Sequence, residues 1–100
     1  MDTPSLDTAI IIEFETTGLD PEKDCIIEIG LIEFAWDPLR QEANITQSYG
    51  GLQDPKRNLP NEIIKITGLT DTVLKGRNID WNSIREILDR ASLIIAHNAA

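Results

Sequence analysis

Two glutamates, Glu13 and Glu15, stand two positions apart in a run of apolar residues. Side chains alternate across a strand, so both carboxylates are predicted to project from one face, with Ile12 and Phe14 on the other. Two carboxylates at this spacing repel each other unless a cation lies between them, and hard divalent ions prefer oxygen ligands. Two such ions about 3.5–4 Å apart form a clamp that cleaves phosphodiesters. For the pair alone, the solvated face of a sheet is the commoner explanation.

The residues that follow the pair could contact a ligand. Two hydroxyls and a glycine come directly after the strand, in the stretch 16–19 (Thr-Thr-Gly-Leu), and Asp20-Pro21 continues the turn. A glycine turn at the carboxyl end of a strand can approach a ligand closely. Taken alone, this stretch is equally consistent with a plain turn.

Composition limits the functions that such a site can serve. The 100-residue chain is 41% hydrophobic, enough for one packed core, and its net charge of −8 argues against a basic patch that coats phosphates. The charge permits metal ions between protein and phosphate. The single cysteine, Cys25, excludes an intramolecular disulfide and a cysteine-based zinc site. With no apolar run of about 18 residues and a polar N-terminus, we expect a cytoplasmic protein that does not bind membranes.

The chain predicts alternating strands and helices. Strands are expected over 8–14, 25–36 and 42–52, joined by short turns as an antiparallel meander. The second has apolar residues on both faces, which predicts a central strand covered on both sides, and Gly30 within it indicates a bulge or close packing.

The period changes after Pro60. Helices are predicted from Pro60 to Gly68, from Thr70 to Gly76, and from Asp80 through Ala91. A strand at 92–96 follows and should run parallel to the first strand. The fold class is therefore a mixed α/β layer. Because such a sheet needs helices on both faces, we expect residues 1–100 to be the N-terminal part of one longer domain.

Three stretches resemble a known family. Residues 13–21 (EFETTGLDP) and 24–30 (DCIIEIG) are similar to the first motif of the DEDD exonucleases. The similarity is closest to the DnaQ-like, DEDDh branch, which includes the proofreading subunit of bacterial DNA polymerase III and ribonuclease T. Residues 66–71 resemble the segment between motifs, and residues 93–99 resemble the start of the second motif. The resemblance covers residues 8–100 and implies a ribonuclease H-like mixed sheet.

The resemblance also implies a mechanism and a site. In such hydrolases four acidic residues hold two Mg²⁺ or Mn²⁺ ions at the 3′ end of a nucleic-acid strand, and a metal-bound water attacks the terminal phosphodiester. Glu13 and Glu15 would be catalytic metal ligands. A polymerase is an expected partner, and His97 is not the family's catalytic histidine. The expected contacts of the terminal nucleotide are Thr16, Thr17, Gly18, Leu19, Thr67, Gly68, Leu69 and Asn98.

The chain departs from the family pattern in two ways. The family usually has Asp where this chain has Glu13, and the remaining acidic residues and the histidine base lie outside residues 1–100. The parent protein is therefore expected to be a 3′–5′ exonuclease acting on single-stranded DNA or RNA, and the 100-residue chain to be inactive alone. The alternative is a degenerate module that binds nucleic acid or a partner without cutting. A structural domain with a solvated acidic face is a third interpretation.

Overall fold

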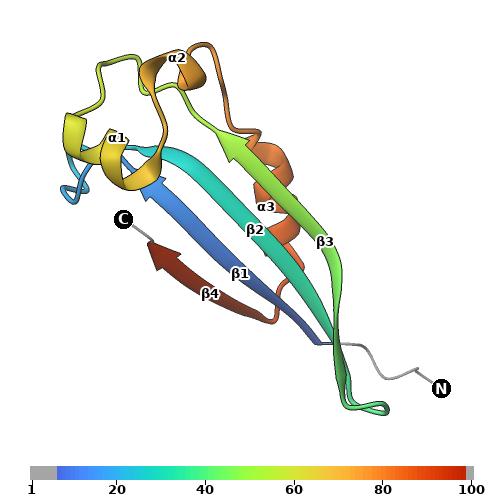
Figure 1. The fold of residues 1–100 in the computed structure, drawn as a ribbon. Coiled ribbons are helices and arrows are strands. Elements are labelled where there is room, and N and C mark those ends of the chain that lie inside the picture. Colours follow the sequence, from blue (N-terminus) through green and yellow to red (C-terminus); the bar gives the residue numbers. More distant parts are fainter. Residues whose placement is uncertain (1–6, 99–100) are drawn as a thin grey trace.

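The computed structural model describes residues 7–98, which form a mixed sheet and three helices (Figure 1). The strand order is β3-β2-β1-β4, with β2 antiparallel to both neighbours and β4 parallel to β1. This confirms the predicted meander followed by a parallel strand. The elements in chain order are β1 (Asp7–Thr16), β2 (Ile26–Asp37), β3 (Glu42–Leu52), α1 (Asn61–Thr67), α2 (Asp71–Leu74), α3 (Trp81–Asp89) and β4 (Leu93–Asn98).

The boundary of β1 differs from the predicted one at the end of the strand that carries Glu13 and Glu15. β1 continues two residues past Phe14, because Glu15 pairs with Glu28 and Thr16 pairs with Ile26 across the ladder. A register shift lies between Glu15 and Thr16. Gly30 marks no bulge; it lies within regular pairing, opposite Glu13 on one side and Gly50 on the other.

Local chemistry sets the helix ends. Pro60 precedes α1, and Gly68 ends it with a left-handed φ of 74°, a conformation that glycine adopts without a steric penalty. The hydroxyl of Thr70 accepts a hydrogen bond from the Val73 amide at the start of α2. α2 is shorter than predicted, since it ends at Leu74. Asp80 caps α3 as expected, accepting from the Ser83 amide.

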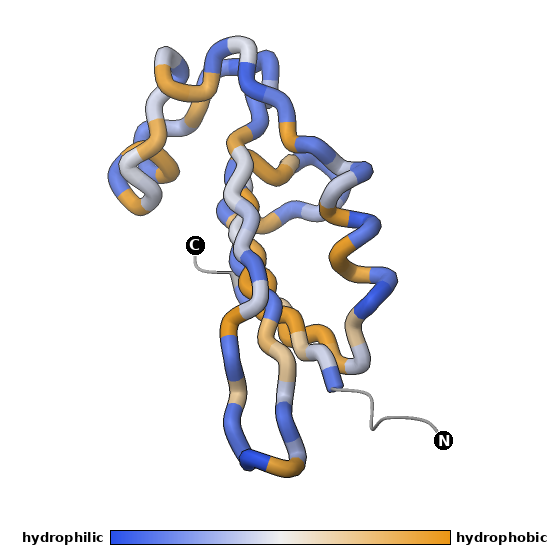
Figure 2. Tube along the Cα trace, turned by 90° about the vertical axis from the view of Figure 1, so that its right-hand side faces the viewer, coloured by the Kyte–Doolittle hydropathy of each residue, from blue (hydrophilic) through white to orange (hydrophobic). Residues whose placement is uncertain are grey.

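Helix α3 covers one face of the sheet (Figure 2). Ile84 and Ile87 of α3 pack against Ile10, Ile29 and Leu31, all of which are buried. A second cluster joins α1 and α2 to the start of β2 and consists of Ile27, Leu59, Ile63 and Leu74. Both clusters include residues of β2, and the first also includes Ile10 of β1, so it helps to hold the strand that carries Glu13 and Glu15.

The other face of the sheet keeps many apolar side chains in contact with solvent. Ile32 is 38% exposed and Leu93 is 56% exposed. We call this surface the open face; its apolar residues are Ala9, Ile11, Ile32, Phe34, Trp36, Leu93 and Ile95. β2 is central, as predicted, but the expectation that both of its faces are covered is wrong for residues 7–98. Its apolar residues on this face are left half-exposed because α3 packs only on the opposite side.

A buried carboxylate connects β2, β3 and α3 on the face covered by α3. Glu33 is 8% exposed and accepts hydrogen bonds from Thr46 Oγ1 at 2.7 Å and Gln47 Nε2 at 3.2 Å. Arg90, at the end of α3, lies 3.4 Å from the same carboxylate. These partners lower the pKa of Glu33, the Thr46 hydroxyl contributing most.

Within the described part of the chain, no helix has the length and apolar character needed to cross a membrane.

Candidate active site

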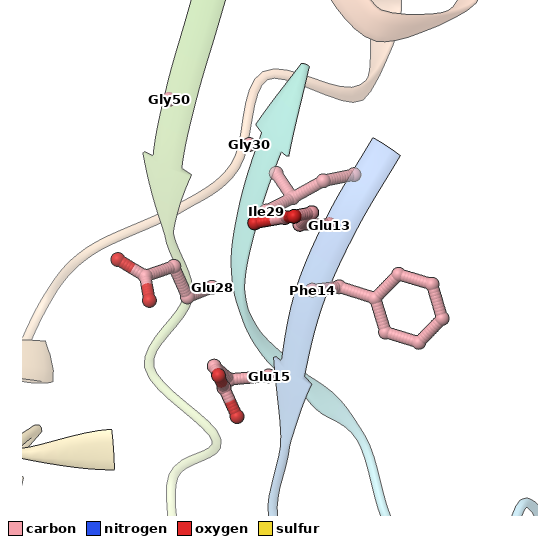
Figure 3. Close-up of a pocket in the computed structure, with 7 residues that line it drawn as sticks. All are labelled: Glu13, Phe14, Glu15, Glu28, Ile29, Gly30 and Gly50. Atoms are coloured by element: carbon pink, nitrogen blue, oxygen red, sulfur yellow. The ribbon is translucent and has the colours of Figure 1, made fainter. Parts of the chain in front are cut away.

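Three glutamates project from one side of β1 and β2. Figure 3 shows the side chains of Glu13, Glu15 and Glu28 on one side of β1 and the Phe14 ring on the other. The alternation predicted for Glu13 and Glu15 is therefore present. Glu28 joins them because it is the cross-strand partner of Glu15. The three side chains line a hollow of about 300 Å³ together with Gly30 and Gly50.

The two glycines leave space beside the carboxylates. Gly30 pairs with Glu13 on β1 and with Gly50 on β3, so the three positions share one face of the sheet. A β-carbon at Gly50 would meet no atom within 4 Å, and one at Gly30 would meet only the Glu13 carbonyl, at 3.9 Å. Larger side chains there would project into the hollow. Sequence reasoning missed Gly50, because its place opposite Gly30 depends on the register of β3.

The surroundings of Glu15 disfavour the ionised form of its carboxyl group. Burial raises its pKa above the ordinary value, and the neighbouring carboxylates of Glu28 and Glu13 raise it further, while His97 opposes them. Its Oε2 atom is buried and has no hydrogen-bond partner among the described residues. A buried carboxylate oxygen without a donor is costly, so this side chain calls for a proton or a cation.

The donors present fit a divalent cation. Carboxylate oxygens are the ligands that Mg²⁺ and Mn²⁺ prefer, and Mg²⁺ is commonly held by one or two carboxylates together with water and substrate phosphates. Among residues 7–98, no three acidic, histidine or cysteine side chains converge into a ready-made cage. Glu13 and Glu15 therefore provide a partial ligand set, whose open positions suit water and phosphate oxygens.

The loop after β1 is closed by its own hydrogen bonds. We call residues 17–25 the clasp loop. The Thr17 amide donates to the Cys25 carbonyl at 2.9 Å, and the Thr17 hydroxyl donates to Asp24 Oδ1 at 2.9 Å. Thr17 is 4% exposed, so its hydroxyl points into the loop. The Thr16 hydroxyl donates to the Gly18 carbonyl. A β-carbon on Gly18 would overlap with the Asp24 carboxylate, so any larger residue here would require that carboxylate to shift.

The clasp loop and α1 form a groove whose lining begins at Thr17, two residues after Glu15 in the sequence. Its volume is about 370 Å³, and Leu19, at its edge, is 84% exposed. The opposite wall consists of Pro60, which precedes α1, and of Glu62, Ile63 and Ile66 on α1. Ile66 is 61% exposed and was not among the predicted contacts.

Thr67, Gly68 and Leu69, which were predicted to contact the nucleotide, lie at the end of α1 and interact with other residues of the chain. The Thr67 hydroxyl donates to the Ile63 carbonyl and accepts from the Leu69 amide, while Gly68 supplies the left-handed turn. Leu69 packs against the cluster that contains Ile63. None of the three is a lining residue of the groove.

The last strand brings the second motif beside the first. His97 pairs with Glu13, and the Asn98 backbone pairs with Phe14. His97 is exposed and lowers the pKa of Glu15 by its charge. The Asn98 side chain lies outside the described part of the structure, so its predicted contact with the substrate strand stays a prediction.

Similarity to known proteins agrees with this geometry. A profile of the RNase T family, described as exonuclease, matches residues 10–100. The chain is 37% identical over 98 residues to DNA polymerase III PolC-type of Thermotoga petrophila, an alignment that covers 92% of this chain and 6% of that protein. It is 34% identical over 87 residues to DNA polymerase III subunit epsilon of Treponema pallidum, covering 85% and 38%.

A solved structure shares the fold at lower identity. The nuclease domain of 3'hExo, a DEDDh family member crystallised with rAMP, matches with a TM-score of 0.59 and 21% identity over 84% of this chain and 43% of that one. The fold is thus that of the ribonuclease H-like exonucleases. The chain belongs to the RNase T exonuclease family, which confirms the resemblance seen in its motifs. It spans 6% of the PolC-type relative and 38% of the epsilon subunit.

Proposed function

We propose that the protein containing this chain is a metal-dependent 3′–5′ exonuclease of single-stranded DNA or RNA, and that residues 1–100 supply the N-terminal part of its exonuclease domain. The observation that carries this proposal is the buried, unpartnered Oε2 of Glu15 next to Glu13, in a chain of the exonuclease family. Such an oxygen is costly in the metal-free fold and becomes favourable once a cation binds.

Glu13 and Glu15 would hold Mg²⁺ or Mn²⁺, two ions being proposed for the complete site. Bound ions would stabilise the phosphate charge and activate water. They would also supply the positive charge that a chain of net charge −8 lacks. Glu28 stands across from Glu15 and adds negative potential to the same hollow. That potential favours cations over a bare polyanionic strand.

The groove between the clasp loop and α1 would receive the terminal nucleotide. The exposed Leu19 offers an apolar contact for a base, and Gly18 allows close approach of the sugar and phosphate. Thr16 and Thr17 would support the loop that contacts the nucleotide, since both of their hydroxyls donate to acceptors within the chain. Thr67, Gly68 and Leu69 would shape the end of α1, and Asn98 would lie beside the strand.

Relatives support proposals on partner and location. The chain aligns with proteins named DNA polymerase III PolC-type and DNA polymerase III subunit epsilon, so a replicative DNA polymerase is the proposed partner and the cytoplasm the proposed location. The 3'hExo domain was crystallised with rAMP, which supports a nucleoside 5′-monophosphate as a ligand of the groove.

The test is a nuclease assay on the full protein and on the 100-residue chain, with 5′-labelled single-stranded DNA and RNA and either Mg²⁺ or Mn²⁺. We expect a ladder shortened from the 3′ end with the full protein, lost in Glu15→Gln and retained in Glu42→Gln, a matched exposed strand glutamate. We expect no ladder from the 100-residue chain. Absence of cleavage by the full protein with both metals would contradict the proposal.

A degenerate binding module is the second candidate. It is favoured by Glu13, which stands where the family usually has Asp and whose extra methylene displaces the carboxylate, whereas Mg²⁺ requires near-ideal ligand geometry. Metal binding separates the two candidates. Mn²⁺ affinity that depends on Glu13 and Glu15 supports the exonuclease, and the absence of such affinity in the full protein supports the module.

A further inference from the structure

One side chain from outside the clasp loop holds it closed. Arg57 lies in the connection between β3 and α1, more than thirty positions away in sequence. We infer that Arg57 is a positioning residue, which fixes the clasp loop so that Gly18 and Leu19 face the groove beside α1. This inference rests on the proposed function, in which that groove receives the terminal nucleotide.

The contacts of Arg57 converge on a single nitrogen. Its Nη2 donates to Thr17 Oγ1 at 2.7 Å and to the Lys23 carbonyl at 2.7 Å. The same nitrogen lies 3.5 Å from Asp24 Oδ1, so Arg57 and Asp24 form an ion pair. The two short bonds reach the first residue of the loop and a residue near its end. One nitrogen therefore ties together both ends of the segment that carries Leu19.

The Thr17 hydroxyl uses its full hydrogen-bonding capacity in this arrangement. A hydroxyl has one donor and two acceptor sites. Thr17 Oγ1 donates to Asp24, accepts from the Cys25 amide at 3.1 Å and accepts from Arg57. Since Thr17 is almost fully buried, loss of Arg57 would leave an acceptor unsatisfied inside the loop.

The same network determines the shape of the groove edge. Asp24 accepts from the Thr17 hydroxyl through one oxygen and from the Asp20 amide through the other. Its carboxylate occupies the space where a β-carbon of Gly18 would lie. Arg57 lies beside Oδ1 of this carboxylate. Its charge contributes to the lowered pKa of Asp24, whose main cause is the hydrogen bond from the Asp20 backbone. If Asp24 moved, the Asp20 amide would lose its acceptor and the carboxylate would no longer lie beside Gly18.

Arginine suits this role better than lysine. The two hydrogens on one guanidinium nitrogen point in fixed directions, which matches two acceptors at the ends of a loop. The three donors of an ammonium group rotate on a flexible stem and are not held in this fixed geometry. Arg57→Lys should therefore restore part of the function that Arg57→Ala loses.

The first measurement is amide hydrogen exchange on the full 100-residue chain. In Arg57→Ala, we expect the amides of Thr17, Asp20 and Cys25 to exchange at least about tenfold faster, as charge-assisted bonds at a half-exposed side chain are lost. Amides of α3 should be unchanged. Arg57→Lys should lie between the two, and the control Arg40→Ala, which removes an equal charge in the β2–β3 turn, should match the wild type.

The second measurement is binding of adenosine 5′-monophosphate to the full protein in the presence of Mn²⁺. Arg57→Ala should weaken AMP binding about tenfold or more while Mn²⁺ affinity in the absence of AMP stays within twofold. Unchanged loop exchange in Arg57→Ala, or unchanged AMP affinity with a loosened loop, would overturn the inference. If the full wild-type protein binds no AMP, the nucleotide contact of the proposed function fails, and the exchange data alone then decide whether Arg57 fixes the loop. If Arg57→Ala does not fold, Arg57→Lys provides the same comparison.

Discussion

Two glutamates on neighbouring strands differ in their surroundings and in what they do for the fold. Glu33 is buried on the face covered by α3 and has the partners Thr46, Gln47 and Arg90. Glu15 lies on the opposite face, where its buried Oε2 has no donor among the described residues. Hydrogen bonds lower the pKa of Glu33, whereas burial, Glu28 and Glu13 raise the pKa of Glu15.

The difference distinguishes a carboxylate that stabilises the fold from one that is available for a ligand. A lowered pKa means that ionisation of the carboxyl is more favourable in the native state than in the unfolded chain, so the ionised group adds to stability relative to the protonated one. A buried charge without donors is tolerated only where something else compensates for it. Substitutions at Glu33 and Glu15 should therefore have opposite effects on the metal-free protein.

The largest expected effect is on metal binding. Glu15→Gln should weaken Mn²⁺ binding by at least about 100-fold, because a neutral amide replaces a charged ligand. A titration of the chain with Mn²⁺, followed by electron paramagnetic resonance or calorimetry, measures it. Glu33→Gln should leave Mn²⁺ affinity unchanged. Equal loss in both variants would remove the distinction between the two carboxylates.

The next effect is on stability. Glu33→Ala should lower the free energy of unfolding by about 2 kcal/mol, because Thr46 and Gln47 lose a buried acceptor and Arg90 loses its ion pair. Urea unfolding followed by circular dichroism measures the change. Glu33→Gln keeps an acceptor for Thr46 and should cost less. A loss below about 0.5 kcal/mol in Glu33→Ala would show that the network contributes little.

The pH dependence of stability should separate the two residues further. The folded-state pKa of Glu33 is lowered, so its contribution is present above its ordinary pKa of about 4.5 and is lost as the pH falls through the lowered value. The folded-state pKa of Glu15 is raised, so its cost is relieved as the pH falls from the raised value toward 4.5. Thermal unfolding from pH 3 to 7 should show a shallower acid loss in Glu33→Gln and a steeper one in Glu15→Gln. Parallel curves for both variants would contradict the assignment.

The smallest effect concerns Glu15 in the absence of metal. Glu15→Gln should raise the free energy of unfolding at pH 7 by less than about 1 kcal/mol, since it removes a partly desolvated charge close to Glu28 and Glu13. Thermal unfolding in the presence of a chelator measures the change. Destabilisation by the same substitution would mean that Glu15 makes favourable contacts in the metal-free fold.

Local sequence rules predicted the framework well. Alternation placed Glu13 and Glu15 on one face, and Pro60, Gly68, Thr70 and Asp80 marked the helix ends, because these signals depend on neighbours within four residues. The predicted mixed sheet, with a parallel last strand, is also confirmed. The site residues themselves remain predictions, although their placement on β1 and the clasp loop is consistent with them.

Features that depend on cross-strand register could not be predicted. The pairing of Glu15 with Glu28 and of Gly30 with Gly50 depends on how far each hairpin slides, which the local pattern does not specify. The hydrogen bond that the Thr17 hydroxyl accepts from Arg57 joins residues forty positions apart, which local patterns do not specify. The half-exposed residues of β2 were expected to be covered because their composition matches that of a buried strand.

The open face and the edge strand β4 have a colloidal consequence. Leu93, Ile94 and Ile95 are each about half exposed on a strand whose outer edge has no pairing partner within residues 7–98, and such edges favour sheet-to-sheet association. The net charge of −8 keeps copies of the chain apart at neutral pH. At high ionic strength, where the screening length falls to about 3 Å at 1 M salt, that repulsion no longer offsets the attraction between apolar surfaces. The acidic residues of the chain thus favour its staying dispersed in solution, in addition to any role in the site.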